Sequence, residues 1–417
     1  MSLLTFQFQA AQKAKKSIGL LSDIKRQNLI RHLADALWKY RTRILSANQK
    51  DADVLEVNNP KRDRLLLNES RLQNIVDQTR MVADLLDPVG QIFVKKTLKN
   101  GLHLQKITVP LGVIGMIYES RPNVTVDAVA LGLRSGNVML LKGSREAIYS
   151  NEALVQIIQE ILEQEGLFKE CVQLLPSDRD TVREILTAVQ YVDLVIPRGS
   201  KNLIDFVREH ARVPVIETGA GVCHTYVHAS ADIEKALLIV ENAKTQRPSV
   251  CNALDTLLVD MSIAENFLPL IAEKFLSHHV EIFADEVSYE IFKKEKYPFF
   301  QKASPEDFGR EYLDLKCSVK VVENMDQALA HIEKYSSKHS EAIVAEDKNI
   351  CQKFLQEVDA AVVYSNASTY FSDGGWFGLG AEMGISTQKL HARGPFALEK
   401  LVCEKWIVEG EGQIRTS

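Results

Sequence analysis

The chain has 417 residues, of which 46% are hydrophobic and 25% charged, and its net charge is −5 at pH 7. This balance is typical of a globular protein and excludes a mostly disordered chain, a collagen-like fibre and a disulfide-stapled miniprotein. The weak negative charge gives no general electrostatic footprint for nucleic acid. At about 100–200 residues per domain, the length allows two or three domains.

The sequence also bears on the compartment. No apolar run approaches the roughly 18 residues that predict a membrane span, and the N-terminal residues lack the pattern of a secretion signal. The six cysteines are scattered without CxxC pairs. We therefore expect no disulfide framework, no metal site and a reducing cytoplasm.

Residues 1–90 predict helices. Apolar residues recur at helical spacing at Ile30, Leu33, Ala34 and Leu37, which predicts one buried face of a helix. A second helix is predicted from about residue 70 to 86, since Asp87-Pro88 disfavours continuation. Arg134, at the end of a later predicted helix, is expected to be solvated.

Two strand-like runs, 91–98 and 102–109, flank Lys99-Asn100-Gly101. Asn-Gly between such runs predicts a hairpin, because both turn residues tolerate positive φ. Its alternation is only partly apolar, so we expect a hairpin that is half exposed or used at a subunit contact.

From residue 109 strands and helices alternate. Apolar runs at 109–118, 137–142, 171–175, 192–196 and 213–216 predict strands, with helices near 123–134 and 147–165. Continuous apolar runs of this length suit strands buried on both faces of a parallel sheet, and right-handed crossovers predict a doubly wound sheet.

A second alternating block follows. Its predicted strands are 224–228, 256–259, 280–283, 319–322, 342–345 and 361–364, and its predicted helices are near 232–243, 264–277, 325–335 and 348–356. The polar segment 293–308 is predicted to be a long loop. A further strand-like run opens the segment 399–414.

Several residues could carry chemistry. Cys251 follows Arg247 and Pro248, which predicts an irregular segment entering a helix, whose N-terminal amides would favour a thiolate. A small buried cysteine is the competing interpretation. Glu217 enters a Gly-rich loop, either lining a site at the strand ends or capping a turn.

Two positions follow predicted strands. Asn123 is either a helix cap or a donor to an oxyanion, and Arg121 could face an anion. Lys142 ends a strand before Gly143-Ser144-Arg145, where it either contacts a nucleotide or lies in a solvated loop. Arg145 would suit a 2′-phosphate.

Five strings of the sequence are unusual: 109–128, 211–221, 242–253, 359–369 and 378–395. With them, residues 10–415 closely resemble the γ-glutamyl phosphate reductases of the aldehyde dehydrogenase superfamily. The resemblance implies an α/β, aldehyde-dehydrogenase-like fold with two doubly wound open-sheet domains and an oligomerisation arm. The expected domains are 1–225 (NADPH binding, containing the 91–108 hairpin), 226–370 (catalytic) and 371–417 (return segment and C-terminal strand).

The resemblance also implies roles for individual residues. Cys251 is the expected nucleophile and Asn123 the expected oxyanion donor. The residues expected to bind NADPH are Lys142, Ser144, Arg145, Gly199, Ser200, Glu217 and Glu311. Those expected to bind the anionic groups of the substrate are Arg121, Arg247, His391 and Arg393. Two positions depart from the family pattern: Val222, which bears on packing near the site, and the string 142–147, which leaves the details of cofactor contact open.

The implied reaction is the NADPH-dependent reduction of L-glutamyl 5-phosphate through a cysteine thioester, in proline biosynthesis. A reductase must keep water from its thioester, so Glu217 is not expected to act as an essential base. The alternatives are an aldehyde-oxidising NAD(P)-dependent dehydrogenase and a silent scaffold. A homo-oligomer is expected, and association with glutamate 5-kinase is a hypothesis without residue-level support.

Overall fold

The computed structural model describes residues 3–56 and 60–415. The chain divides into two compact units. Unit 1 comprises Met1–Thr218, Gly378–Gly384 and Pro395–Ser417, and unit 2 comprises Gly219–Phe377 and Ile385–Gly394. The chain thus enters unit 2 before the expected boundary at 225, and the expected return segment 371–417 is shared between both units.

Unit 1 begins with helices, as predicted. Its helices are α1 (Leu3–Gly19), α2 (Asp23–Lys39), α3 (Arg41–Asp53), α4 (Pro60–Leu65), α5 (Glu69–Asp84), α6 (Pro122–Arg134), α7 (Ile148–Gln164), α8 (Arg179–Thr187) and α9 (Lys201–His210). The predicted apolar face of α2 is buried, and α5 ends before Asp87.

The sheet of unit 1 has the strand order β5-β4-β3-β6. Its strands are β3 (Val113–Tyr118), β4 (Val138–Lys142), β5 (Val172–Leu174) and β6 (Leu194–Arg198), and all pairs are parallel. The chain runs outward from β3 to β5 and then returns to the other side of β3. This topological switch point is where ligands bind in doubly wound sheets.

Arg134 corrects the sequence analysis, because its side chain is 0% exposed. The guanidinium lies 2.6 Å from a carboxylate oxygen of Asp23 and donates hydrogen bonds to the carbonyl oxygens of Ala83 and Leu85. A buried charge persists only when it is paired in this way. The pairing comes from α2 and the end of α5, so the local sequence around α6 could not predict it.

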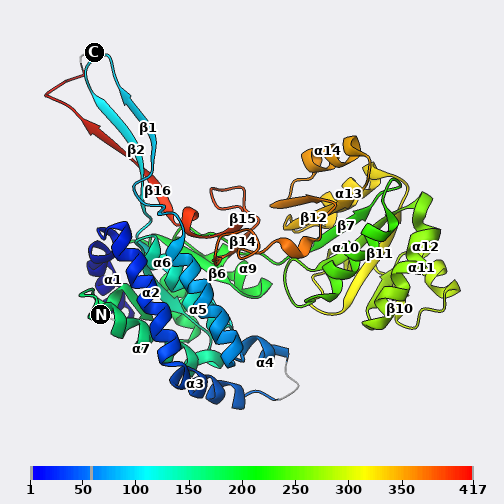
Figure 1. Cartoon of the computed structure of the whole chain (residues 1–417), viewed down its shortest axis with the longest axis horizontal. Helices are drawn as coiled ribbons and strands as arrows, with labels where there is room; N and C mark the ends of the chain where they lie inside the picture. The colour runs from blue at the N-terminus through cyan, green and yellow to red at the C-terminus, as the bar shows by residue number, and fades with distance from the viewer. Residues whose placement is uncertain (1–2, 57–59, 416–417) are drawn as a thin grey trace. The chain divides into compact units, whose positions relative to one another are not determined.

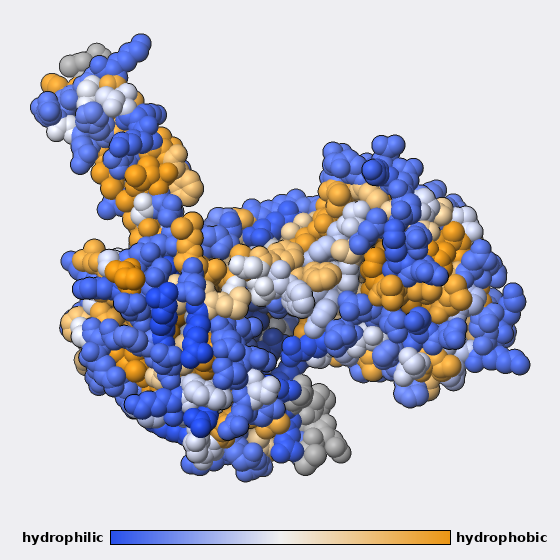
Figure 2. Space-filling model, in the orientation of Figure 1, coloured by the Kyte–Doolittle hydropathy of each residue, from blue (hydrophilic) through white to orange (hydrophobic). Residues whose placement is uncertain are grey.

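A separate three-stranded antiparallel sheet has the order β1-β2-β16. It joins β1 (Ile92–Thr97), β2 (His103–Pro110) and β16 (Val402–Glu409), which confirms the hairpin and the C-terminal strand. The turn differs from the two-residue type, since Leu98 pairs with Leu102 and, within 99–101, positive φ is found at Gly101 alone. Figure 1 shows this sheet projecting from the helices of unit 1, and Figure 2 shows hydrophobic residues gathered along it.

The sheet of unit 2 has the order β10-β9-β11-β8-β7-β12-β13. Its strands are β7 (Cys223–Val227), β8 (Leu254–Asp260), β9 (Glu281–Ala284), β10 (Phe300–Lys302), β11 (Lys316–Val322), β12 (Ser340–Val344) and β13 (Val362–Ser365). Its helices are α10 (Ile233–Thr245), α11 (Met261–Ser277), α12 (Glu286–Lys294), α13 (Met325–Tyr335) and α14 (Lys348–Glu357). The short strands β14 (Gly384–Ser386) and β15 (Gly394–Phe396) pair separately.

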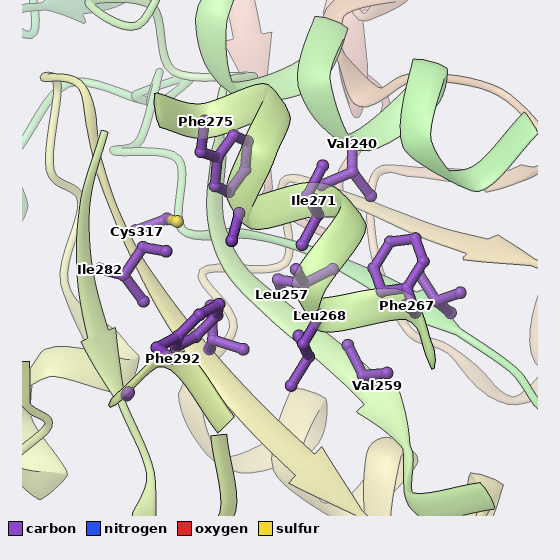
Figure 3. Close-up of a cluster of buried hydrophobic side chains, with 14 of the residues drawn as sticks. Val240, Leu257, Val259, Phe267, Leu268, Ile271, Phe275, Ile282, Phe292 and Cys317 are labelled. Atoms are coloured by element: carbon purple, nitrogen blue, oxygen red, sulfur yellow. The ribbon is translucent and has the colours of Figure 1, made fainter. Parts of the chain in front are cut away.

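Neighbouring strands of the unit 2 sheet all pair in parallel, so unit 2 is also an α/β layer structure. Figure 3 shows the core on one face, where Phe267 and Ile271 of α11 pack against Leu257 of β8 and Ile282 of β9. This core fixes the central strand β8, which directly follows Cys251.

The predicted loop 293–308 is wrong in part. Residues 300–302 form β10, a short edge strand parallel to β9. The ring of Phe300 lies 5.0 Å from that of Tyr289 on α12 and packs against the core of unit 2. Tertiary packing of one aromatic ring therefore overrides the polar composition of this segment.

Candidate active site

Cys251 lies in the cysteine loop, residues 246–253, which joins α10 to β8. The expectation of a following helix is wrong, because the chain passes directly into β8, and Leu254 pairs with Cys223 of β7. Pro248 instead limits the preceding helix, because a proline disfavours helical backbone just before it. Helix α10 accordingly ends at Thr245. No helix N-terminus therefore supports a thiolate here.

Burial distinguishes Cys251 from most of the other cysteines. Cys171, Cys223, Cys317 and Cys351 are buried, whereas Cys251 is partly exposed. Burial raises the pKa of Cys171 to about 11 and that of Cys317 to about 12, and such thiols are inert. The exposed Cys403 lies on β16, and partial burial raises its pKa too.

The segment 219–223 passes very close to the backbone of Cys251. A Cβ atom on Gly221 would lie 1.6 Å from the carbonyl oxygen of Cys251, so only glycine fits at this position. The thiol of Cys223 donates to the same carbonyl oxygen at 3.2 Å. The backbone N–H of Gly221 donates to Glu311 at 2.9 Å, so Glu311, expected to bind NADPH, lies in unit 2 beside the cysteine loop.

Asn252 anchors the other side of the loop. Its side-chain amide donates to the carbonyl oxygens of Tyr370 and Ser372, and the hydroxyl of Thr369 donates to its backbone carbonyl at 2.7 Å. The sequence analysis missed this anchor. Its sequence signal is an amide residue next to Cys251, but the partners lie more than a hundred residues away.

In unit 1, the carboxyl ends of β3 and β4 lie side by side. Two residues that are expected to bind NADPH, Lys142 and Ser144, lie at the end of β4. Lys142, its last residue, is 9% exposed, and burial lowers its pKa while the Asp178 carboxylate opposes this shift. The Ser144 hydroxyl accepts a hydrogen bond from the backbone N–H of Ser120 at 3.1 Å. Ser120 has φ of 22°, a conformation that marks strain at functional loops.

Glu119, which directly follows β3, bridges the switch point and was missed by the sequence analysis. One carboxylate oxygen accepts from the backbone N–H of Ser200 and the other from its hydroxyl, both at 2.9 Å. A Cβ on Gly199 would lie 2.7 Å from the Glu119 carboxyl carbon. Glu119, after β3, thus holds Gly199 and Ser200, after β6, which are two of the residues expected to bind NADPH. Arg145, another of these residues, is exposed.

Asn123 is not the cap of α6. The N-cap is Arg121, whose side chain makes no capping bond, and Pro122 occupies the first turn. The Asn123 amide donates to Asp127 one turn along the helix at 3.1 Å. An amide nitrogen carries two hydrogens, so Asn123 keeps a second donor for another acceptor.

Glu217 forms a bidentate pair with Arg208 of α9. Its two carboxylate oxygens lie 2.5 Å from Nη2 and 3.1 Å from Nε of the guanidinium. This contact raises the pKa of Arg208. A carboxylate held in two charge-assisted hydrogen bonds is a poor base for activating water.

The residues expected to bind the substrate differ in their surroundings. Arg247 and His391 are exposed, and Arg121 is partly exposed. Arg393 donates to Asp359 at 2.7 Å, and this basic neighbourhood lowers the pKa of Asp359. Arg393 is therefore already paired with a carboxylate of its own unit.

The described ranges, 3–56 and 60–415, contain no group of three or more His, Cys, Asp or Glu side chains placed to hold a metal ion. Among the helices of these ranges, none has the length and apolar character needed to cross a membrane.

Comparisons with known proteins give consistent relatives. The model of the aldehyde dehydrogenase family matches residues 5–287. The γ-glutamyl phosphate reductase of Chlorobium phaeobacteroides (strain BS1) is 52% identical over 98% of both chains, and that of Legionella pneumophila (strain Paris) is 48% identical over 98% of both.

Solved structures give the same family of relatives. The crystal structure of γ-glutamyl phosphate reductase from Thermotoga maritima matches this chain over 100% of both chains, with 42% identity and a TM-score of 0.93. An acetylating aldehyde dehydrogenase from Geobacillus thermoglucosidasius shares the fold, with a TM-score of 0.73 at 16% identity over 99% of this chain and 98% of that one.

Gly221→Ala should disturb the cysteine loop, because the new methyl group would overlap the Cys251 carbonyl oxygen. We expect a loss of stability of about 1–3 kcal/mol, typical of overpacking, and an altered rate of Cys251 alkylation by iodoacetamide. Gly219→Ala is the matched control, since its Cβ would meet only the Thr387 hydroxyl at 3.4 Å. Unchanged melting and alkylation in Gly221→Ala would contradict the close approach.

Proposed function

Because the chain belongs to the aldehyde dehydrogenase family and, within it, to the γ-glutamyl phosphate reductases, we propose that it reduces L-glutamyl 5-phosphate to L-glutamate 5-semialdehyde and phosphate. This is a step of proline biosynthesis. The observation that carries the proposal is the identity of about half of all residues over the full length of such reductases. A nucleophilic thiol must stay reduced, so we place the enzyme in the cytoplasm.

The nucleophile in this proposal is the thiolate of Cys251. It attacks the γ-carbonyl carbon of the acyl phosphate, a C–S bond forms, the C–O bond to phosphate breaks, and phosphate leaves with its electron pair. The backbone N–H of Cys251 and the second amide hydrogen of Asn123 are the proposed donors to the oxyanion. When the thiohemiacetal formed by reduction collapses, the C–S bond breaks and Cys251 returns to the thiolate.

Reduction requires a nicotinamide nucleotide, which supplies the hydride. The switch point of unit 1 fits such a ligand: Lys142 ends β4 and Ser144 follows it, and Gly199 and Ser200, which follow β6, are fixed by Glu119. We propose that these residues bind it, together with Glu217 and Glu311. The exposed side chain of Arg145 would meet a 2′-phosphate, which supports NADPH over NADH.

The substrate carries a carboxylate, an amine and a phosphate. We propose that Arg121, Arg247, His391 and Arg393 bind its anionic groups. Arg247 suits the phosphate best, because it is exposed on the cysteine loop itself. Arg393 is paired with Asp359, so its role would require an exchange of partners.

The reverse reaction separates this proposal from its alternatives. Protein, NADP⁺, phosphate and glutamate 5-semialdehyde are mixed, and NADPH absorbance is followed. We expect absorbance that requires phosphate and is absent in Cys251→Ala, because phosphate must take the acyl group from the thioester. Absorbance without phosphate would indicate an aldehyde-oxidising dehydrogenase, and none at all from folded protein would favour a silent scaffold.

Glu217→Gln should retain most of the reductase activity. Glutamine keeps an acceptor for Arg208, and a reductase needs no base for hydrolysis of its thioester. Cys251→Ser is the reference variant and should lose activity by several orders of magnitude, since the nucleophile is removed. Steady-state rates of both variants provide the comparison. A loss in Glu217→Gln as large as that in Cys251→Ser would contradict this role.

We further propose that the sheet β1-β2-β16 carries a contact between copies of the chain. Phe93, Trp406 and Val408 are 62%, 48% and 54% exposed on it, and contiguous exposed apolar residues mark interaction sites. Trp406→Glu should shift sedimentation toward smaller species. The exposed Leu238 of unit 2 gives the control Leu238→Glu. Equal sedimentation of Trp406→Glu and the unsubstituted chain would contradict the contact.

A further inference from the structure

Asp255 occupies a β-bulge at the start of β8. Cys223 of β7 pairs with Leu254, but the next residue, His224, pairs with Thr256, so Asp255 is the extra residue. Bulges re-aim a side chain and are frequent beside active sites. Asp255 is 2% exposed, and it follows Cys251 closely in the sequence.

The Asp255 carboxylate joins two segments that are distant in sequence. One oxygen accepts a hydrogen bond from the backbone N–H of Cys223 at 3.4 Å, and the other accepts from that of Tyr312 at 3.0 Å. Cys223 closes the segment that bears Gly221, and Tyr312 follows Glu311. Because Gly221 also donates to Glu311, the two segments are tied together twice.

Lys244, near the end of α10, supplies the opposite charge. Its side chain is 0% exposed, and its ammonium donates to the carbonyl oxygen of Leu254 at 2.8 Å. Burial raises the pKa of Asp255 to about 7, and Lys244 opposes this shift. Burial lowers the pKa of Lys244, and Asp255 opposes that shift in turn. Burial thus disfavours the charged form of both groups, and the charge of each partly offsets this effect on the other.

We propose that Asp255 is a positioning residue for the reaction at Cys251. Its carboxylate holds the Gly221 and Glu311 segments in register against the backbone of the cysteine loop, while Lys244 makes the buried carboxylate tolerable. The inference rests on the proposed role of Cys251 as nucleophile. It extends that role to a residue that acts through the backbone of the segments it joins.

Two variants separate positioning from stability. Asp255→Asn removes the carboxylate charge that opposes the burial of the Lys244 ammonium, so it should lower both Tm and kcat. The double variant Lys244→Met/Asp255→Asn removes both buried charges, so it should recover Tm. Its kcat should stay about 10²-fold low, because misplacement of a reacting group has that effect, while KM for the acyl phosphate stays near its original value. The double variant is informative even where Asp255→Asn alone fails to fold.

Asp260→Asn is the matched control. Asp260 lies at the other end of β8, is 6% exposed, and accepts from the Ser262 N–H and the Tyr226 hydroxyl. It should lower Tm and leave kcat unchanged. Recovery of both Tm and kcat in the double variant would overturn the proposal, as would an equal loss of kcat in Asp260→Asn.

A second readout is independent of the proposed substrate. Alkylation of Cys251 by iodoacetamide, followed by mass spectrometry, should be slower in the double variant and unchanged in Asp260→Asn. Absence of turnover in the unsubstituted protein would contradict the proposed function but leave this readout intact. Equal alkylation rates in all three proteins would overturn the positioning role.

Discussion

The close approach of the segment 219–223 to the backbone of Cys251 is the constraint on which the chemistry of unit 2 depends. It is possible only because position 221 has no side chain. The approach brings the Gly221 amide to Glu311 and the Cys223 thiol to the Cys251 carbonyl. In the described chain, Cys251 is followed by β8 and not by a helix. Backbone contacts from neighbouring segments hold the cysteine loop instead.

In unit 1, hydrogen bonds to the backbone fix a loop at the edge of the sheet. The switch point of its sheet brings the ends of β3, β4 and β6 together, and Glu119 fixes the loop after β6 by two hydrogen bonds. The bidentate pair of Glu217 with Arg208 also fits a reductase, because a carboxylate committed to a guanidinium is not poised to activate water against a thioester.

Local patterns predicted the fold well, and distant contacts account for what they missed. Apolar periodicity located α2 and α5, Asn-Gly located the β1-β2 turn, and continuous apolar runs located the buried parallel strands, except that 213–216 forms only an isolated bridge at Val215. Two further errors share one cause. Arg134 is buried because Asp23 and two carbonyl groups of α5 surround it, and β10 forms because Phe300 packs against unit 2. Likewise, family strings made Cys251 and Lys142 candidates, whereas Glu119, Asn252 and Asp255 contact partners that are visible only in the folded chain.

The central claim is that Cys251 carries the acyl group during turnover. The most direct measurement incubates the protein with L-glutamyl 5-phosphate, generated in place, without reduced nucleotide, followed by acid quench and mass spectrometry of the peptides. The account predicts the mass of a glutamyl group on the peptide that contains Cys251, and its loss when NADPH is added before the quench. A glutamyl group on another cysteine, or turnover with no labelled Cys251 peptide, would contradict the account.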